Sequence, residues 1–236
     1  MSRRHVSKIK REETNDIGIV LLAYETGQKS KSHTSKYLLS TNNGESVLER
    51  QSKIISGVFS ENSLYIATGS DCDKIASMVS KNVRIVENQN FQSTGAAEYI
   101  RLVINNSAES SLLIVDGSIL FSEDVLLDLD FSKSFVLCSE ESSEQQEIGA
   151  TISEGCISQF SFGLQNKIYD MIFLKDHELN LAEKICKNRD KNKLLMFEVL
   201  NFVVNNGGSI HPQMPKRSGS VKKIESAKDV HENSNI

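Results

Sequence analysis

The sequence predicts an α/β protein with a Rossmann-like layered fold and a mainly parallel central sheet. A continuous apolar run at residues 17–23 is typical of a strand buried on both faces, as in a parallel sheet. Strand-like and amphipathic helix-like segments then alternate through the first half of the chain with short connections. Beyond residue 130 the alternation gives way to short β-like segments, which predicts a β-rich insertion.

The first half of the chain supplies the strands and helices of the predicted sheet layer. The opening strand ends at Thr26-Gly27, and a polar, serine-rich loop follows it. The apolar spacing after Ser46 predicts a helix with one apolar side, and Ser46 with Glu49 forms a predicted capping box. The next strands and helices are predicted, in alternating order, at residues 64–68, 73–79, 83–86, 96–105 and 112–115.

The second half of the chain is less regular. It is predicted to contain three β-like segments, two helices and a last short strand, at residues 134–139, 147–153, 156–162, 179–187, 194–205 and 220–224. The acidic stretch ESSEQQE predicts a solvated hairpin loop between the first two β-like segments. Asn206-Gly207-Gly208 suits a helix C-cap, and Pro212 and Pro215 are expected in one loop. The last dozen residues are charged and are expected to fray.

Composition excludes several classes of protein. With 27 basic and 31 acidic residues, the net charge of −4 offers no electrostatic footprint for nucleic-acid binding. No apolar run reaches the roughly 18 residues that a membrane-spanning helix needs. The basic opening segment has no apolar core, so it does not read as a secretory signal. Four widely spaced cysteines predict reduced thiols, and we therefore expect a cytoplasmic protein without disulfides or structural zinc.

Candidate binding residues follow the predicted strands, because ligands of open parallel sheets collect beyond the carboxyl ends of the strands. The loop after the first strand contains Gly27, Lys29 and Lys36, whose backbone N–H groups and charges could hold a phosphate. An exposed polar loop is the other interpretation of this composition. No Walker A, G-x-S-x-G or H-E-x-x-H pattern is present.

Two further strand ends carry candidate residues. Asp116 ends the strand at 112–115, where a carboxylate could bind Mg²⁺, although Asp116-Gly117 also suits a simple turn. The small residues Thr94-Gly95-Ala96 open a predicted helix, where a base or phosphate could approach the backbone closely. A helix cap with packed alanines is the alternative for this second segment.

In chain order these pieces resemble the nucleotidyltransferases that activate sugar phosphates or phosphocholine. The opening signature of that family, L-A-A-G-x-G-x-R, is similar to LAYETGQK at 22–29, in which Lys29 replaces the arginine. The family's P-K, N-x-x-[FY] and metal-bearing D-G-D segments correspond to SKYLL at 35–39, NQNF at 88–91 and DGS at 116–118. The closing E-I-D-[ST]-x-x-D motif resembles KIESAKD at 223–229. The likeness covers about residues 17–230.

The resemblance implies an enzyme that transfers a nucleoside monophosphate from an NTP to a small phosphorylated acceptor. It implies that Lys29 and Lys36 are catalytic and that Asp116 and Glu225 hold Mg²⁺. The residues that it implies for nucleotide binding are Ala23, Gly27, Thr94, Gly95 and Ala96. It also implies one domain at 17–230, with a nucleotide-binding half (17–130) and an acceptor half (131–230), between a flexible basic arm (1–16) and a short tail (231–236).

Departures from the family pattern keep a second interpretation open. Tyr24 and Glu25 replace small residues of the phosphate loop, and Ser118 replaces a metal-binding aspartate. These changes are typical of a catalytically weakened relative that binds a nucleotide or a partner protein without turnover. A glycosyltransferase ranks third, because it needs a D-x-D metal pair of which only Asp116 is present.

Overall fold

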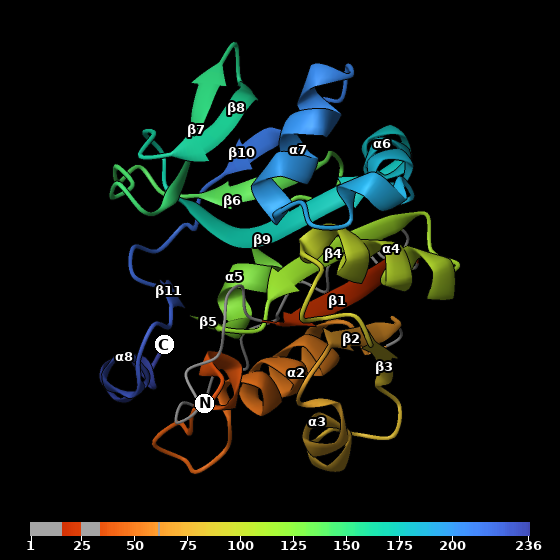
Figure 1. Ribbon diagram of the computed structural model, residues 1–236. Coiled ribbons are helices and arrows are strands. Elements are labelled where there is room, and N and C mark those ends of the chain that lie inside the picture. The colour runs from red at the N-terminus through yellow and green to blue at the C-terminus, as the bar shows by residue number, and fades with distance from the viewer. Residues whose placement is uncertain (1–15, 25–33, 61) are drawn as a thin grey trace.

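A computed structural model of the protein describes residues 16–24, 34–60 and 62–236. A seven-stranded sheet with the order β10-β6-β9-β4-β1-β2-β3 forms its centre (Figure 1). The strands are β1 (Ile17–Ala23), β2 (Leu64–Thr68), β3 (Arg84–Glu87), β4 (Ser111–Asp116), β6 (Phe135–Cys138), β9 (Ile168–Lys175) and β10 (His211–Gln213). Four of the six neighbouring pairs are parallel, and both pairs that involve β9 are antiparallel. The predicted mixed α/β fold with a mainly parallel sheet is confirmed.

Helices cover both faces of this sheet (Figure 1). Alternate residues of β1 pack on opposite sides, with Val20 in one core and Leu21 in the other. The first core receives side chains from α4, α6 and α7, and the second receives them from α2, α3 and α5. The helices are α2 (Val47–Val58), α3 (Cys72–Met78), α4 (Ala96–Asn106), α5 (Glu123–Leu127), α6 (Asp176–Cys186), α7 (Met196–Asn205) and α8 (Ala227–Asn233).

The beginning of the chain folds as its sequence predicts. All seven residues of β1 are buried, and β1 pairs in parallel with β2 and β4. Helix α2 begins at the predicted capping box, in which Glu49 N donates to Ser46 Oγ and Ser46 N donates to a Glu49 carboxylate oxygen. Strand pairing thus fixes β1, and the capping box fixes the start of α2, on either side of the segment that carries Lys36.

The second half of the chain differs from the prediction in how its β-segments pair. Strand β6 joins the main sheet, because all four of its side chains are buried there, whereas β7 (Ile148–Ser153) and β8 (Cys156–Phe162) form a separate hairpin. The stretch ESSEQQE therefore connects two different sheets and is not a hairpin loop. In Figure 1 the β7–β8 hairpin lies beyond β6 and β10, away from the edge formed by β3.

Three further elements correct the sequence-based prediction. Strand β9 was not predicted, although it lies between β4 and β6 in the sheet. Pro212 lies in β10 rather than in a loop, at the edge of the sheet, which is a position that tolerates a residue without an N–H group. The segment after residue 226 forms α8 instead of fraying, because Ser226 and Asp229 build a capping box at its start.

Candidate functional site

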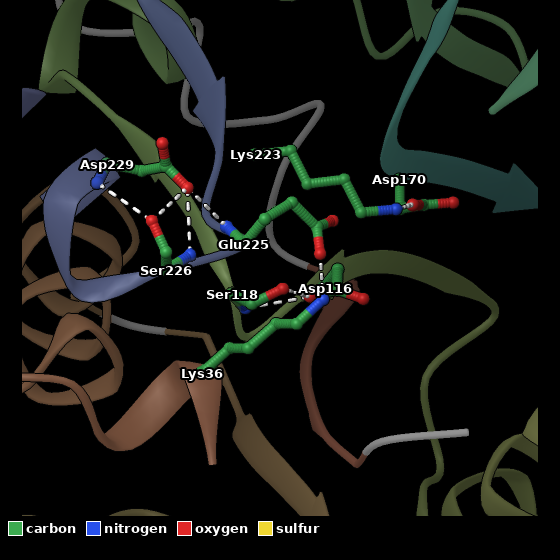
Figure 2. Close-up of polar contacts among 8 residues, drawn as sticks. All are labelled: Lys36, Asp116, Ser118, Asp170, Lys223, Glu225, Ser226 and Asp229. Carbon is green, nitrogen blue, oxygen red and sulfur yellow. Dashed lines mark hydrogen bonds and ion pairs between the residues drawn. The ribbon is translucent and has the colours of Figure 1, made fainter. Parts of the chain in front are cut away.

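Five charged side chains from separate parts of the sequence gather at the carboxyl end of β4. Figure 2 shows how they lie around the Asp116 carboxylate. The cluster contains three carboxylates and two ammonium groups, which belong to Asp116, Asp170, Glu225, Lys36 and Lys223. We call this group the β4-end cluster. It brings together three of the residues predicted from the sequence, namely Lys36, Asp116 and Glu225.

Asp116 is placed by the register of the central sheet. It is the last residue of β4 and lies opposite Leu22 of β1, while the preceding residue of β4 pairs with Met171 of β9. The side chain of Asp170, on β9, therefore lies near the Asp116 carboxylate at the same edge. Like charges placed in this way across two strands repel each other and require a compensating cation.

The Asp116 carboxylate is held on one side only. Ser118 donates to Asp116 Oδ1 from its backbone N (2.7 Å) and from its Oγ (2.5 Å), in the turn that leads to β5 (Ile119–Phe121). Burial raises the pKa of Asp116, and the negative charge of Asp170 raises it further, whereas the Lys223 ammonium and the Ser118 hydrogen bonds oppose this shift. Burial and the neighbouring Asp170 charge thus both favour the protonated form of Asp116.

Lys223 supplies the positive charge nearest to these two aspartates. It lies on β11 (Val221–Lys223), which pairs antiparallel with β5 and so brings the C-terminal segment back to the turn after Asp116. Its Nζ donates to Asp170 Oδ2 at 2.9 Å. The charge of Asp170 is the first cause of a raised pKa for Lys223, with contributions from Asp116 and Glu225 against the effect of burial.

Lys36 and Glu225 form an ion pair that closes the cluster on the other side (Figure 2). Lys36 opens the 3-10 turn η1 (Lys36–Leu38), which is held by hydrogen bonds from Ser35 and Tyr37 to Asp71 at 2.8 and 2.6 Å. Glu225 is held by its backbone N, which donates to Asp229 Oδ2 at 3.0 Å in the cap of α8. The C-terminal segment therefore delivers Lys223 and Glu225 together to the end of β4.

The remaining predicted nucleotide-binding residues have identifiable packing partners. Ala23 ends β1 and is buried. Thr94 accepts a hydrogen bond from the Asn88 side-chain amide at 2.9 Å, which fixes the loop before α4. A Cβ on Gly95 would lie 2.4 Å from the backbone oxygen of Lys193, so close packing by itself demands glycine there. Ala96 is fully buried at the start of α4.

Two features of the site modify what the sequence implied about the phosphate loop. Gly27 and Lys29, together with Glu25, lie outside the described residues. Tyr24 is described, and its ring packs against that of Tyr99 with centroids 4.8 Å apart. Burial raises the pKa of Tyr24 far above its usual value, with Asp116 as the next cause, so the phenol stays protonated beside that carboxylate. The aromatic pair therefore forms a wall next to the β4-end cluster.

Sequence reasoning missed Asp170 and did not use Lys223. Asp170 lies in an apolar stretch, IYDMIFLK, that carries no turn signal, and the strand containing it was not predicted. The feature that indicates a functional role for Asp170 is its acidic side chain within an apolar stretch, because a buried charge needs a partner. Lys223 begins the closing motif and differs in charge from the glutamate at that motif position.

The β4-end cluster offers carboxylate oxygens, which are the kind of ligand that Mg²⁺ takes. Mg²⁺ commonly binds one or two carboxylates and retains several waters. Asp116 Oδ1 accepts both hydrogen bonds from Ser118, whereas Oδ2 accepts none from the described residues. Within that part of the chain, no group of three or more His, Cys, Asp or Glu side chains is arranged to hold a metal ion by itself.

Comparisons of sequence and structure gave different results. No family model and no curated protein matches the sequence. Among the 16–24, 34–60 and 62–236 segments, no helix is long and apolar enough to cross a bilayer. Solved structures do match, and several of them are nucleotidyltransferases.

Three of these structures illustrate the similarity. CTP:phosphocholine cytidylyltransferase from Streptococcus pneumoniae (LicC) is 18% identical, with a TM-score of 0.69 over 91% of this chain and 96% of that chain. The inositol-1-phosphate CTP transferase from T. maritima is 16% identical, with a TM-score of 0.67 over 91% of each chain. HddC from Yersinia pseudotuberculosis, complexed with GMP-PN, is 15% identical, with a TM-score of 0.66 over 92% of this chain and 98% of that chain. The resemblance drawn from the motifs is confirmed at the level of the fold: the chain has the fold of sugar-phosphate and phosphocholine nucleotidyltransferases.

Proposed function

We propose that this protein is a Mg²⁺-dependent nucleotidyltransferase that transfers a nucleoside monophosphate from an NTP to a sugar phosphate or a phosphocholine-like acceptor. The observation that carries the proposal is the convergence of Lys36, Asp116 and Glu225 at the end of β4. These residues come from three distant parts of the sequence. The motifs of the sequence single out all three of them.

The proposed reaction needs positioning and charge neutralisation more than covalent help from the protein. A phosphate oxygen of the acceptor attacks the α-phosphorus of the NTP and forms a new P–O bond. The bond from the α-phosphorus to the oxygen that bridges to the β-phosphorus breaks, and pyrophosphate leaves with that electron pair. Developing charge on the phosphoryl oxygens is what a set of fixed cations stabilises.

Each site residue has a proposed role in this step. Lys36 contacts the transferring phosphoryl group, and Lys29 contacts the phosphates of the NTP. Nucleotide binding is the role that the resemblance assigns to Ala23, Gly27, Thr94, Gly95 and Ala96. Asp116 and Glu225 hold Mg²⁺, which supplies charge neutralisation and orientation for the phosphates when it is bound. Lys36 exchanges its ion pair with Glu225 for a phosphate when substrate enters.

A second candidate function is nucleotide or partner-protein binding without turnover. Ser118 favours it, because a hydroxyl that donates to Asp116 leaves the metal site one carboxylate poorer than the family pattern. Tyr24 favours it as well, since a bulky ring replaces a small residue where the backbone approaches the nucleotide. Binding of an NTP without any pyrophosphate release would identify this second function.

A titration of the four NTPs with and without Mg²⁺ tests the proposal. One NTP should bind more tightly in the presence of Mg²⁺, and Lys36→Ala should weaken that binding about tenfold or more, because a charged hydrogen bond to phosphate is lost. The control variant is Lys53→Ala, an exposed lysine of α2 paired with Glu45. Removal of residues 1–14 should leave the affinity unchanged, because none of the proposed site residues lies in that segment. Loss of binding on removal of the arm, with Lys36→Ala silent, would place the functional site elsewhere.

A further inference from the structure

Lys223 differs from the other lysines of the described segments in its surroundings. Its Nζ bonds Asp170 at 2.9 Å and lies in the field of Asp116 and Glu225. Its side chain is half-buried, with 36% of its surface exposed. An ammonium has three N–H donors, and Asp170 accepts from one of them.

The charge balance of the β4-end cluster depends on Lys223. Three carboxylates and two ammonium groups leave a net charge of −1. In the closing motif that this segment resembles, position 223 is a glutamate, and in the metal-bearing motif position 118 is an aspartate. Lys223 and Ser118 together therefore make the site three charge units more positive than that pattern. Such a site needs less help from a divalent cation to accept a phosphate.

Neutralising the two aspartates is a simpler role for Lys223, but its place at the end of β4 points to a ligand as well. The Arg101–Glu98 pair on α4 is more enclosed, with side chains that are 11% and 4% exposed. The Lys223–Asp170 pair, at 36% and 25%, remains open at the edge of the sheet where strand ends bind ligands. Figure 2 shows Lys36 and Lys223 entering the cluster from different elements, with Lys36 paired to Glu225 and Lys223 paired to Asp170.

We propose that the Lys223 ammonium is a permanent positive charge of the site and binds a phosphate group of a substrate directly. It thereby neutralises part of the phosphate charge that the metal would otherwise neutralise. Asp170 is its positioning residue. The proposal rests on the proposed function, because it names a phosphate ligand for the same site. The phosphate can belong to the pyrophosphate end of the NTP or to the acceptor, and both sources present the same oxygens to Lys223.

Calorimetric titration in EDTA with two probes, inorganic pyrophosphate and phosphocholine, tests the proposal and separates the two sources. The protein should bind at least one probe without metal, and Lys223→Met should weaken that binding at least tenfold. Lys222→Met is the matched control, because Lys222 is the exposed neighbour on the same strand. The probe whose affinity falls identifies which phosphate Lys223 contacts. Mn²⁺ affinity, measured without nucleotide, should rise in Lys223→Met because a competing ammonium is gone.

The double variant Asp170→Asn/Lys223→Met guards against misfolding and against a general charge effect. It removes both partners of the ion pair, so Asp170 is not left as an unpaired carboxylate, and it keeps the net charge of the protein. Its probe affinity should also fall at least tenfold. Unchanged probe affinity in both variants, or no metal-free binding by the unaltered protein, overturns the role of Lys223. Mg²⁺-dependent NTP binding in that same preparation would leave the proposed function standing, and its absence would remove both.

Discussion

Two ionic clusters of this protein use the same chemistry in opposite ways. On α4, Arg101 donates from Nε and Nη2 to the two carboxylate oxygens of Glu98 at 2.8 and 2.7 Å, and Arg189 lies 3.7 Å from one of them. That carboxylate is satisfied on both oxygens and almost fully buried. At the end of β4, by contrast, Asp116 and Asp170 share the single ammonium of Lys223 within reach of solvent.

This difference gives a criterion for deciding whether an ion cluster stabilises the fold or binds a ligand. A closed bidentate pair within α4 leaves no carboxylate oxygen for a ligand. The β4-end cluster has an excess of carboxylate, an open lysine and Asp116 Oδ2 without a hydrogen bond from the described residues. Such a site attracts a cation and a phosphate together. Perturbed pKa values agree with this contrast, since that of Glu98 is lowered and that of Asp116 is raised.

The largest effect is expected from Asp116→Asn. Pyrophosphate release should fall about a thousandfold, because the metal-holding carboxylate is lost where phosphoryl charge develops. The free energy of unfolding should not fall, since a neutral amide replaces a carboxylate that burial disfavours. Steady-state kinetics and urea unfolding measure the two quantities, with the exposed Asp73→Asn on α3 as control. Activity equal to that of the unaltered protein would show that Asp116 has no role in the reaction, and the functional difference between the two clusters would then be contradicted.

Arg101→Met breaks the other cluster and should act on stability alone. It leaves the Glu98 carboxylate buried without its main partner, which should lower the free energy of unfolding by about 3 kcal/mol. Lys53→Met, which breaks an exposed pair with Glu45, should change it by less than about 1 kcal/mol. Urea denaturation provides the measurement. Loss of nucleotide affinity by folded Arg101→Met would mean that the α4 cluster also serves binding.

Ser118→Asp sharpens the comparison by restoring the family's second carboxylate. Ser118 is buried and donates to Asp116, so an aspartate there adds repulsion and lowers stability in the absence of metal. Mg²⁺ affinity should rise about tenfold, equivalent to roughly 1.4 kcal/mol, and Mg²⁺ should restore the thermal stability. Metal titrations followed by melting temperature will detect both effects. A variant that is silent in both measurements, together with a silent Asp116→Asn, would argue against any metal site here.

The smallest effect is expected in the pH dependence of stability, with opposite signs for the two clusters. The Arg101 hydrogen bonds lower the pKa of Glu98, so this carboxylate stabilises the fold above its unfolded pKa near 4.5 and loses that contribution as the pH falls through the folded value. Burial raises the pKa of Asp116, so its contribution is present below its unfolded pKa near 3.8 and is lost as the pH rises through the raised value. Urea midpoints of Glu98→Gln and Asp116→Asn across pH 3–7 should therefore deviate from the unaltered protein in opposite directions. Urea midpoints that deviate in the same direction for both variants would contradict a lowered pKa for Glu98 together with a raised pKa for Asp116.

Local patterns predicted the first half of the fold because its signals are short-range. The apolar run of β1, the Ser46 capping box and the Asp116 strand end each follow from a few adjacent residues. Strand β9 escaped prediction because its partners β4 and β6 are distant in sequence and its one charge interrupts the apolar run. The charged residues at the end of the chain predict fraying, yet a capping box at Ser226 begins the helix α8 there.

The candidate site was predictable only in part, for the same reason. Motif likeness singled out Lys36, Asp116 and Glu225, which the fold brings to one cluster. The pairing of Asp170 with Lys223 depends on β9 and β11 meeting at the end of β4, and no local pattern encodes that meeting. Gly95, which was assigned to the nucleotide, is accounted for by its contact with the backbone of Lys193.

The most direct test of the central claim is phosphorus NMR of the protein with Mg²⁺, the NTP that binds best and a phosphorylated acceptor such as phosphocholine or a sugar 1-phosphate. The account predicts that the acceptor phosphate resonance is replaced by a diphosphate ester pair while free pyrophosphate appears in equal amount. Asp116→Asn, run in parallel, should leave the spectrum unchanged over the same time. NTP that binds but stays intact with every phosphorylated acceptor, at full Mg²⁺, would contradict the enzyme and leave a binding protein in its place.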